Sequence, residues 1–231
     1  MRTLITGASG AIGRAVAKAF RDDVLILQAN RQHAALETFV YEERLDARVD
    51  VCDLEAEDAL DAWMTTIGQI DRLVFVAGNH VHGLIVDQPI EDLDRLYRVH
   101  VRALARVVQS VVQAKPYDAP LDIVVVSSVW GEVGAAGEVF YSTVKAAQLG
   151  FVKAFARESG PFRVRINAVT PGWIDTPMND TVEETKEEAI AAIPLGRLGH
   201  VEEVARTIRF LCSKEAGYMT GAILRIDGGW Q

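Results

Sequence analysis

The chain has few of the features that would place it outside a reduced, aqueous compartment. Its 231 residues include only two cysteines, Cys52 and Cys212, and neither sits in a metal-type spacing. The longest apolar runs, such as residues 123–126, are far too short to cross a bilayer. The N-terminus shows no signal-peptide pattern, because residues 3–6 already read as a strand that feeds a glycine turn. We therefore expect a cytoplasmic protein with reduced thiols.

Positive charge is also scarce. The chain has 24 Lys and Arg against 32 Asp and Glu, a formal charge of −8 that argues against a nucleic-acid surface and mildly against an acidic membrane. It has no internal repeat, low-complexity stretch or flexible linker. With 49% apolar and 24% charged residues, its composition is that of an ordinary globular protein. We expect one domain spanning residues 1–231.

Short β-branched runs alternate along the chain with longer amphipathic stretches. The runs are continuously apolar, as is typical of strands covered on both faces. Alternation of this kind predicts right-handed βαβ units, an α/β fold and a doubly wound, Rossmann-type parallel sheet of about seven strands. The expected strands are residues 3–6, 24–28, 48–51, 72–76, 122–127, 164–169 and 222–226, and the expected helices include 12–20, 90–114, 141–158 and 201–212.

A glycine-rich turn joins the first expected strand to the first expected helix. Glycines let the backbone approach a pyrophosphate, and the start of the helix supplies free N–H groups and a positive dipole end. An isolated glycine cluster is often an ordinary turn, but this one stands directly between a strand and a helix, so we expect a dinucleotide. The candidate contacts are Gly7, Ser9, Gly10, Ala11, Ile12 and Gly13.

The end of the second strand bears on which dinucleotide binds. A carboxylate there would bond the adenosine ribose hydroxyls and repel a 2′-phosphate. The chain instead has Asn30, which is neutral, and Arg31, which can offer a fork of donors to that phosphate. This favours NADP(H) over NAD(H), unless Arg31 is only a solvated charge at a helix start. Asp50 and Val51, after the third strand, are expected at the adenine edge.

Tyr141 and Lys145 are spaced to lie one turn apart on the same face of a helix. The ordinary pKa of tyrosine is about 10, and an adjacent ammonium is expected to lower the pKa of Tyr141 toward the working range. A bare Tyr-x-x-x-Lys is common by chance. Here it follows a strand that ends at Ser128, which could bond a substrate oxygen or simply form a strand-end turn.

These motifs occur in order along nearly the whole chain, and together they resemble the single-domain short-chain dehydrogenases/reductases, with the 3-oxoacyl-thioester (acyl carrier protein) reductases as the most similar-looking members. The resemblance rests on residues 6–13, Asp50-Val51, Ala77-Gly78, Ser128, Tyr141 with Lys145, residues 167–172, residues 196–199 and residues 226–229. It implies an oxidoreductase that transfers a hydride between NADP(H) and a carbonyl or secondary alcohol.

The resemblance also implies roles for individual residues. Tyr141 is expected as the general acid, Lys145 as the residue that holds the nicotinamide ribose and lowers the Tyr141 pKa, and Ser128 as the residue that orients the carbonyl. Ala77 and Gly78 are expected to pass close to the cofactor ribose. Four residues are expected around the nicotinamide and pyrophosphate, namely Pro171, Gly172, Ile174 and Thr176.

The chain departs from the family pattern at several positions. Ala11 stands where the family has a glycine, and the arginine often found at the Gly10 position is missing, which leaves Arg31 as the main phosphate contact, with Arg14 as a possible assistant. Phe75-Val76 replaces a pair of asparagines. His100 replaces the asparagine that supports a water behind the lysine, so it either holds that water or only packs locally.

The substrate and the assembly are less constrained. Loop residues at the same sheet edge are expected to shape the pocket: Asn79, His80, His82, Trp130 and Trp173. A metal at the two histidines is disfavoured, since no third ligand is at hand. The acidic stretch 117–122 argues against a carrier-protein partner and leaves a free small ketone, quinone or sugar comparably favoured.

The resemblance implies a mobile lid over residues 178–193 and a homotetramer, with a homodimer as second choice, in which the helix 146–155 packs against a second copy. The alternative to an active enzyme is a non-catalytic or regulatory dinucleotide-binding protein. The intact Ser128, Tyr141 and Lys145 favour the enzyme.

Overall fold

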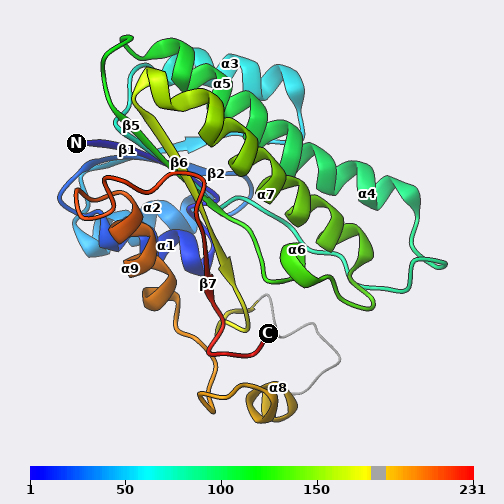
Figure 1. Ribbon diagram of the computed structural model, residues 1–231. Coiled ribbons are helices and arrows are strands. Elements are labelled where there is room, and N and C mark those ends of the chain that lie inside the picture. Colours follow the sequence, from blue (N-terminus) through cyan, green and yellow to red (C-terminus); the bar gives the residue numbers. More distant parts are fainter. Residues whose placement is uncertain (178–185) are drawn as a thin grey trace.

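A computed structural model describes residues 1–177 and 186–231 (Figure 1). Within these residues, seven strands form one parallel sheet in the order β3-β2-β1-β4-β5-β6-β7. The predicted doubly wound α/β fold is therefore confirmed. The strands are β1 (Arg2–Thr6), β2 (Val24–Ala29), β3 (Ala47–Val51), β4 (Arg72–Phe75), β5 (Leu121–Val126), β6 (Val164–Pro171) and β7 (Ile223–Ile226).

Helices cover both faces of the sheet, which explains why the strands are apolar throughout (Figure 1). One face packs against α1 (Ala11–Ala19), α2 (His33–Glu43) and α9 (Val201–Leu211), and the other against α3 (Glu57–Ile67), α5 (Ala103–Ala114) and α7 (Val139–Ser159). The remaining helices are α4 (Ile90–Tyr97), α6 (Trp130–Val133), α8 (Lys186–Ala192) and a 3-10 turn, η2 (Gly160–Phe162). Among the described residues, no helix combines the length and the apolar character needed to span a membrane.

The predicted single helix over residues 90–114 is wrong in one respect. A π-helical turn, η1 (Arg98–Arg102), interrupts it between α4 and α5, and His100 lies in the middle of that turn. A π-turn contains one extra residue per turn and occurs most often at functional sites. The apolar periodicity of the sequence could not reveal it, because the helix continues on both sides.

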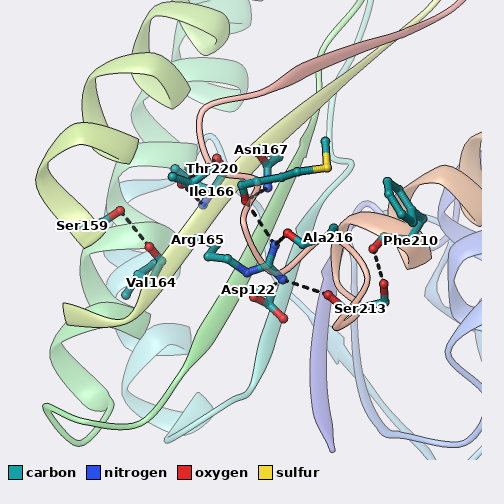
Figure 2. Close-up of polar contacts among 11 residues, drawn as sticks. Asp122, Ser159, Val164, Arg165, Ile166, Asn167, Phe210, Ser213, Ala216 and Thr220 are labelled. Carbon is teal, nitrogen blue, oxygen red and sulfur yellow. Dashed lines mark hydrogen bonds and ion pairs between the residues drawn. The ribbon is translucent and has the colours of Figure 1, made fainter. Parts of the chain in front are cut away.

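The edge of the sheet at which the strands begin is stabilised by charged side chains (Figure 2). Arg165 at the start of β6 pairs with Asp122 at 2.7 Å and donates to the carbonyl of Ala216 at 2.7 Å. The side chain of Asn167 donates to the carbonyl of Met219 at 3.1 Å, so the segment before β7 is tied to β6.

This geometry corrects the interpretation of the acidic stretch 117–122. Residues 117–120 directly precede β5, and residues 121–122 are its first two residues. The stretch therefore lies at the edge of the sheet where the strands begin. Ser128 follows the other end of β5, a strand length away. The acidic stretch therefore does not form a rim around the Tyr141 site, and its charge gives no argument about substrates there.

Candidate active site

A cavity of about 1180 Å³ lies at the carboxyl ends of the strands, the edge that doubly wound sheets use for ligands. It is continuous from the glycine turn to the Tyr141 helix. Its lining brings together most of the residues expected from the sequence: Gly7, Ser9, Gly10, Ala11, Ile12, Gly13, Ala77, Gly78, His100, Ser128, Tyr141, Lys145, Pro171, Gly172, Ile174 and Thr176.

The glycine turn is tightly packed against the end of β4. Gly7 has φ +65°, and a Cβ there would lie 2.6 Å from the Cα of Ala77; a Cβ on Gly13 would lie 2.4 Å from the Gly7 carbonyl oxygen. Gly10 has φ −72°, a Cβ there would make an ordinary contact with the Gly7 carbonyl oxygen at 3.5 Å, and Ala11 begins α1 without a positive φ. The alanine at position 11 is thus compatible with the turn.

Gln28 braces this turn, which the sequence analysis missed. Its side chain is buried in β2, accepts from the Gly7 N–H at 2.8 Å and donates to the Cys52 carbonyl at 2.8 Å. A glutamine inside an otherwise apolar strand was the available signal, because a buried amide has to find partners.

The residues expected at the adenosine end lie apart from the cavity lining. Asn30 and Arg31 are exposed just beyond β2. The Asp50 carboxylate accepts from Trp63 Nε1 at 2.9 Å and pairs with Arg48, while Val51 is exposed. Arg14 does line the cavity, and its Nε donates to the Ser9 carbonyl at 3.1 Å.

Ser128, Tyr141 and Lys145 converge on one wall of the cavity. Lys145 is buried, and its Nζ lies 5.4 Å from the centre of the Tyr141 ring and donates to the Val126 carbonyl at 3.0 Å. Ser127 anchors the helix by donating to the Lys145 carbonyl at 2.9 Å. Ser128 Oγ accepts from the Trp130 N–H at 3.2 Å, so the serine also forms the strand-end turn.

The electrostatics of the pair differ from the expectation that Lys145 lowers the pKa of Tyr141. Burial raises the pKa of Tyr141 above its ordinary value, the nearby Glu138 carboxylate adds to the rise, and a hydrogen bond with Ser128 opposes it. Burial also lowers the pKa of Lys145 to about 7. Desolvation is the largest cause of both shifts, so Tyr141 is a neutral phenol.

His100 is buried beside this pair. Its Nε2 lies 2.9 Å from the Asn79 carbonyl oxygen and 3.2 Å from the Asn79 nitrogen, its own carbonyl accepts from Gln148, and its Nδ1 is buried with no partner within the described residues. Burial, followed by the charge of Lys145, holds the pKa of His100 well below its ordinary value, so the ring is neutral.

The segment after β6 forms the cavity wall beyond Ser128, Tyr141 and Lys145. Ile174 is buried and forms a β-bridge with Gly199, which holds the segment in place. Three tryptophans line this part of the cavity, and Trp230 contacts Trp130 and Trp173 with ring centres 4.7 and 5.8 Å apart. Trp230 was not expected from the sequence, because its position depends on the C-terminal segment crossing the sheet edge.

The loop residues His80 and His82 each contact the segment that precedes α7. His80 Nε2 lies 2.6 Å from Glu138 Oε1, and His82 packs against Gly137. Across residues 1–177 and 186–231, no group of three His, Cys, Asp or Glu side chains is arranged to hold a metal. Of the proposed lid, α8 begins at Lys186, and the part over residues 178–185 lies outside the described residues.

A glycine-rich turn between β1 and α1 that shares one cavity with a serine, a tyrosine and a lysine is the arrangement of Rossmann-type oxidoreductases. The profile of the family described as enoyl-(acyl carrier protein) reductase matches residues 7–231. The chain belongs to the short-chain dehydrogenase/reductase family.

Individual relatives agree with this assignment. An uncharacterized oxidoreductase, YmfI, of Bacillus subtilis is 39% identical over 98% of this chain and 97% of its own length. The 3-oxoacyl-[acyl-carrier-protein] reductase FabG of Thermotoga maritima is 37% identical over 98% of this chain and 96% of its own. A short-chain dehydrogenase/reductase from Serratia marcescens superposes with a TM-score of 0.91 at 28% identity, over 99% of this chain and 97% of that one.

Proposed function

We propose that this chain, as one domain spanning residues 1–231, is an NADP(H)-dependent carbonyl reductase or alcohol dehydrogenase. The observation that carries the proposal is the convergence of Ser128, Tyr141 and Lys145 on one wall of a cavity that continues to the glycine turn. Proximity of these groups to a bound carbonyl supplies much of the rate enhancement. A non-catalytic binding protein has no need of all three.

Ser128, Tyr141 and Lys145 have different roles in the proposed reaction. Ser128 orients the carbonyl by donating a hydrogen bond to its oxygen. The Tyr141 phenol, kept protonated by its raised pKa, gives its proton to the oxygen as the alcohol forms. Lys145, only partly charged near neutral pH because its pKa is about 7, stabilises in its charged form the phenolate that this transfer leaves on Tyr141. The protonated Tyr141 is the form that ketone reduction requires.

The glycine turn and the segment after β6 fit a nicotinamide dinucleotide, because close packing there excludes side chains and leaves the cavity open to the start of α1. When bound, the dinucleotide supplies or accepts the hydride. Residues of the glycine turn would hold its pyrophosphate, Ala77, Gly78, Tyr141 and Lys145 its ribose, and Pro171, Gly172, Ile174 and Thr176 its nicotinamide end. Asn30, Asp50 and Val51 are proposed for the adenosine end.

His100 is proposed as the residue that links Lys145 to a water. The short contact of Nε2 with the Asn79 carbonyl favours the tautomer that donates from Nε2, which leaves Nδ1 as a buried acceptor without a partner within the described residues. A water donating to Nδ1 would restore the relay that the family builds with an asparagine.

Substitution of Tyr141 by phenylalanine tests the proposal. We expect kcat for ketone reduction with NADPH to fall about 10²–10⁴-fold, because the general acid is lost. The dissociation constant for NADPH should rise by no more than about 10-fold, because Tyr141 gives only one of the proposed ribose contacts. The panel includes acetoacetyl thioesters and free ketones. A wild-type protein that binds NADPH tightly but reduces none of them would identify a regulatory dinucleotide-binding protein instead.

Cofactor preference tests the role of Arg31, with Arg14 as an assisting cation on the cavity wall. We expect Arg31→Asp to lower the ratio of kcat/KM for NADPH over NADH by at least about 10-fold, since a charge-assisted contact with the 2′-phosphate is exchanged for repulsion. The exposed Arg209→Asp in α9 serves as the matched control. Equal use of both cofactors by the wild type would overturn the NADP(H) assignment.

A further inference from the structure

The cavity wall contains an imidazole–carboxylate pair that the proposed reaction does not use. His80 follows β4, Glu138 precedes α7, and His80 Nε2 lies 2.6 Å from Glu138 Oε1. Their side chains are 14% and 7% exposed, and both residues line the cavity beside Tyr141. The His80 ring meets the Tyr141 ring edge-on, with centres 5.1 Å apart.

The pair is held in place by the two loops that carry it. The Gly83 N–H donates to the Gly137 carbonyl at 2.9 Å, and the Glu138 carbonyl accepts from the Ser142 N–H at 2.7 Å. His82 fills the space in which a Cβ on Gly137 would lie. A side chain fixed this way before binding loses little freedom when a ligand arrives.

The carboxylate determines which nitrogen of His80 carries the proton. An ionised carboxylate only accepts, so an imidazole that carries one proton donates it from Nε2 and keeps a lone pair on Nδ1. Nδ1 has no hydrogen-bond partner among the described residues and is not among the side-chain atoms sealed from solvent. The cavity therefore presents an oriented hydrogen-bond acceptor next to the catalytic tyrosine.

We propose that His80, oriented by Glu138, accepts a hydrogen bond from a hydroxyl group near the reacting carbon, so that the substrate is a hydroxylated ketone or the corresponding diol. This inference rests on the proposed reductase function. The thioester carbonyl of a 3-oxoacyl substrate can only accept and finds no donor on Nδ1. An anionic substituent at this place would meet the Glu138 carboxylate and be repelled.

The aromatic part of the lining fits the same substrate. Trp130, Trp173 and Trp230 offer apolar ring surfaces on which the C–H groups of a compact hydroxyketone can pack. A site that combines apolar contact with a few placed polar groups selects by those polar groups, and a missing hydroxyl leaves its acceptor unpaired.

Three ketones that share the cyclohexanone ring and differ only in the substituent at C2 test the inference: 2-hydroxycyclohexanone, 2-methoxycyclohexanone and cyclohexanone. We expect kcat/KM for the hydroxyketone to exceed that of the other two by at least about 10-fold, because the methoxy compound keeps the oxygen but has no proton to donate. Equal values for the three would overturn the inference and leave the reductase function standing. Failure of the wild type to reduce these ketones and acetoacetyl thioesters would instead reject the proposed function.

Substitutions of His80 and Glu138 test whether this pair causes the preference for the hydroxyketone. His80→Phe keeps a ring edge against Tyr141 and removes the acceptor, so the ratio of hydroxyketone to cyclohexanone should fall to near one. Glu138→Gln should lower the ratio as well, because an amide can donate to Nε2 and move the proton to Nδ1. Glu158→Gln, an exposed carboxylate of α7, should keep the wild-type ratio. A ratio that survives both His80→Phe and Glu138→Gln would show that another part of the cavity selects the hydroxyl.

Discussion

The single buried residue Lys145 lowers the free energy of unfolding of the protein. The side chain is 3% exposed, and within residues 1–177 and 186–231 its Nζ donates a single hydrogen bond, to the Val126 carbonyl. A buried ammonium is costly unless it is paired, which is why the pKa falls to about 7. The proposed function gives a reason for this costly burial, because the proposed chemistry at Tyr141 uses a cation beside the phenol.

This burial predicts a pH-dependent stability effect. Between pH 7 and the ordinary lysine pKa near 10.4, the unfolded chain binds one more proton than the folded chain, so the free energy of unfolding rises with pH. Lys145→Met should therefore raise the free energy of unfolding by about 2–4 kcal/mol below pH 7 and by little near pH 10.5. Urea unfolding at pH 6, 8 and 10 measures this.

The exposed Lys153 of the same helix provides the comparison. Lys153→Met removes a solvated ammonium and should change the free energy of unfolding by a small, pH-independent amount. A gain from Lys145→Met that is the same at all three pH values would contradict the assigned burial effect.

At the scale of elements, the turn after β4 and the π-turn η1 are fitted to each other. A Cβ on Gly78 would lie 2.6 Å from His100 Cε1, although the φ of Gly78 is not in the left-handed region. The glycine is thus required by the histidine ring and not by backbone strain. The same ring bonds the Asn79 backbone, so one side chain of η1 sets the path of the loop that carries His80.

This fit predicts a coupled pair of substitutions. Gly78→Ala alone should lower the free energy of unfolding by about 1–3 kcal/mol, because His100 is buried and cannot move aside. Asparagine at position 100 has no atom at the Cε1 position, so the loss from Gly78→Ala should largely disappear in a His100→Asn background. A double-mutant cycle in urea measures the coupling, and strict additivity would argue against the contact.

At the scale of the whole molecule, the exposed side of α7 is available for assembly. Ala146, Ala147, Gly150 and Ala154 are exposed on this helix, and small residues allow close approach of a second helix. We propose a homotetramer, with a homodimer as second choice. Figure 1 shows α7 on the outer layer of the sheet face that also carries α4 and α5.

Gly150→Arg tests this assembly without disturbing the single chain, because nothing lies within 4 Å of a Cβ built there. Light scattering should give four times 25.3 kDa for the wild type and a smaller mass for Gly150→Arg, with unchanged secondary structure. Tyr41→Arg on α2, exposed on the other face, should keep the wild-type mass. A wild-type mass of one chain would reject the proposed assembly.

Much of the fold and of the candidate site could be predicted because the signals are local. Continuous apolar runs indicate strands buried on both faces, and the glycine turn and the Tyr141–Lys145 spacing each lie within a few residues. The π-turn could not be predicted, since one extra residue leaves the apolar stripe of residues 90–114 intact. The acidic stretch 117–122 was misplaced because charge alone does not tell which edge of the sheet a loop occupies.

The sequence by itself determined the fold class, the family resemblance and the identity of the candidate serine, tyrosine and lysine. Only the tertiary structure decided that the pKa of Tyr141 is raised and not lowered, because that pKa depends on burial and on the Glu138 carboxylate. It likewise joined His80 to Glu138 across 58 residues of chain and brought Trp230 to the cavity. Sequence patterns carry the conformational preferences of residues that are close along the chain. Desolvation and contacts between distant residues arise only after the helices and strands have packed.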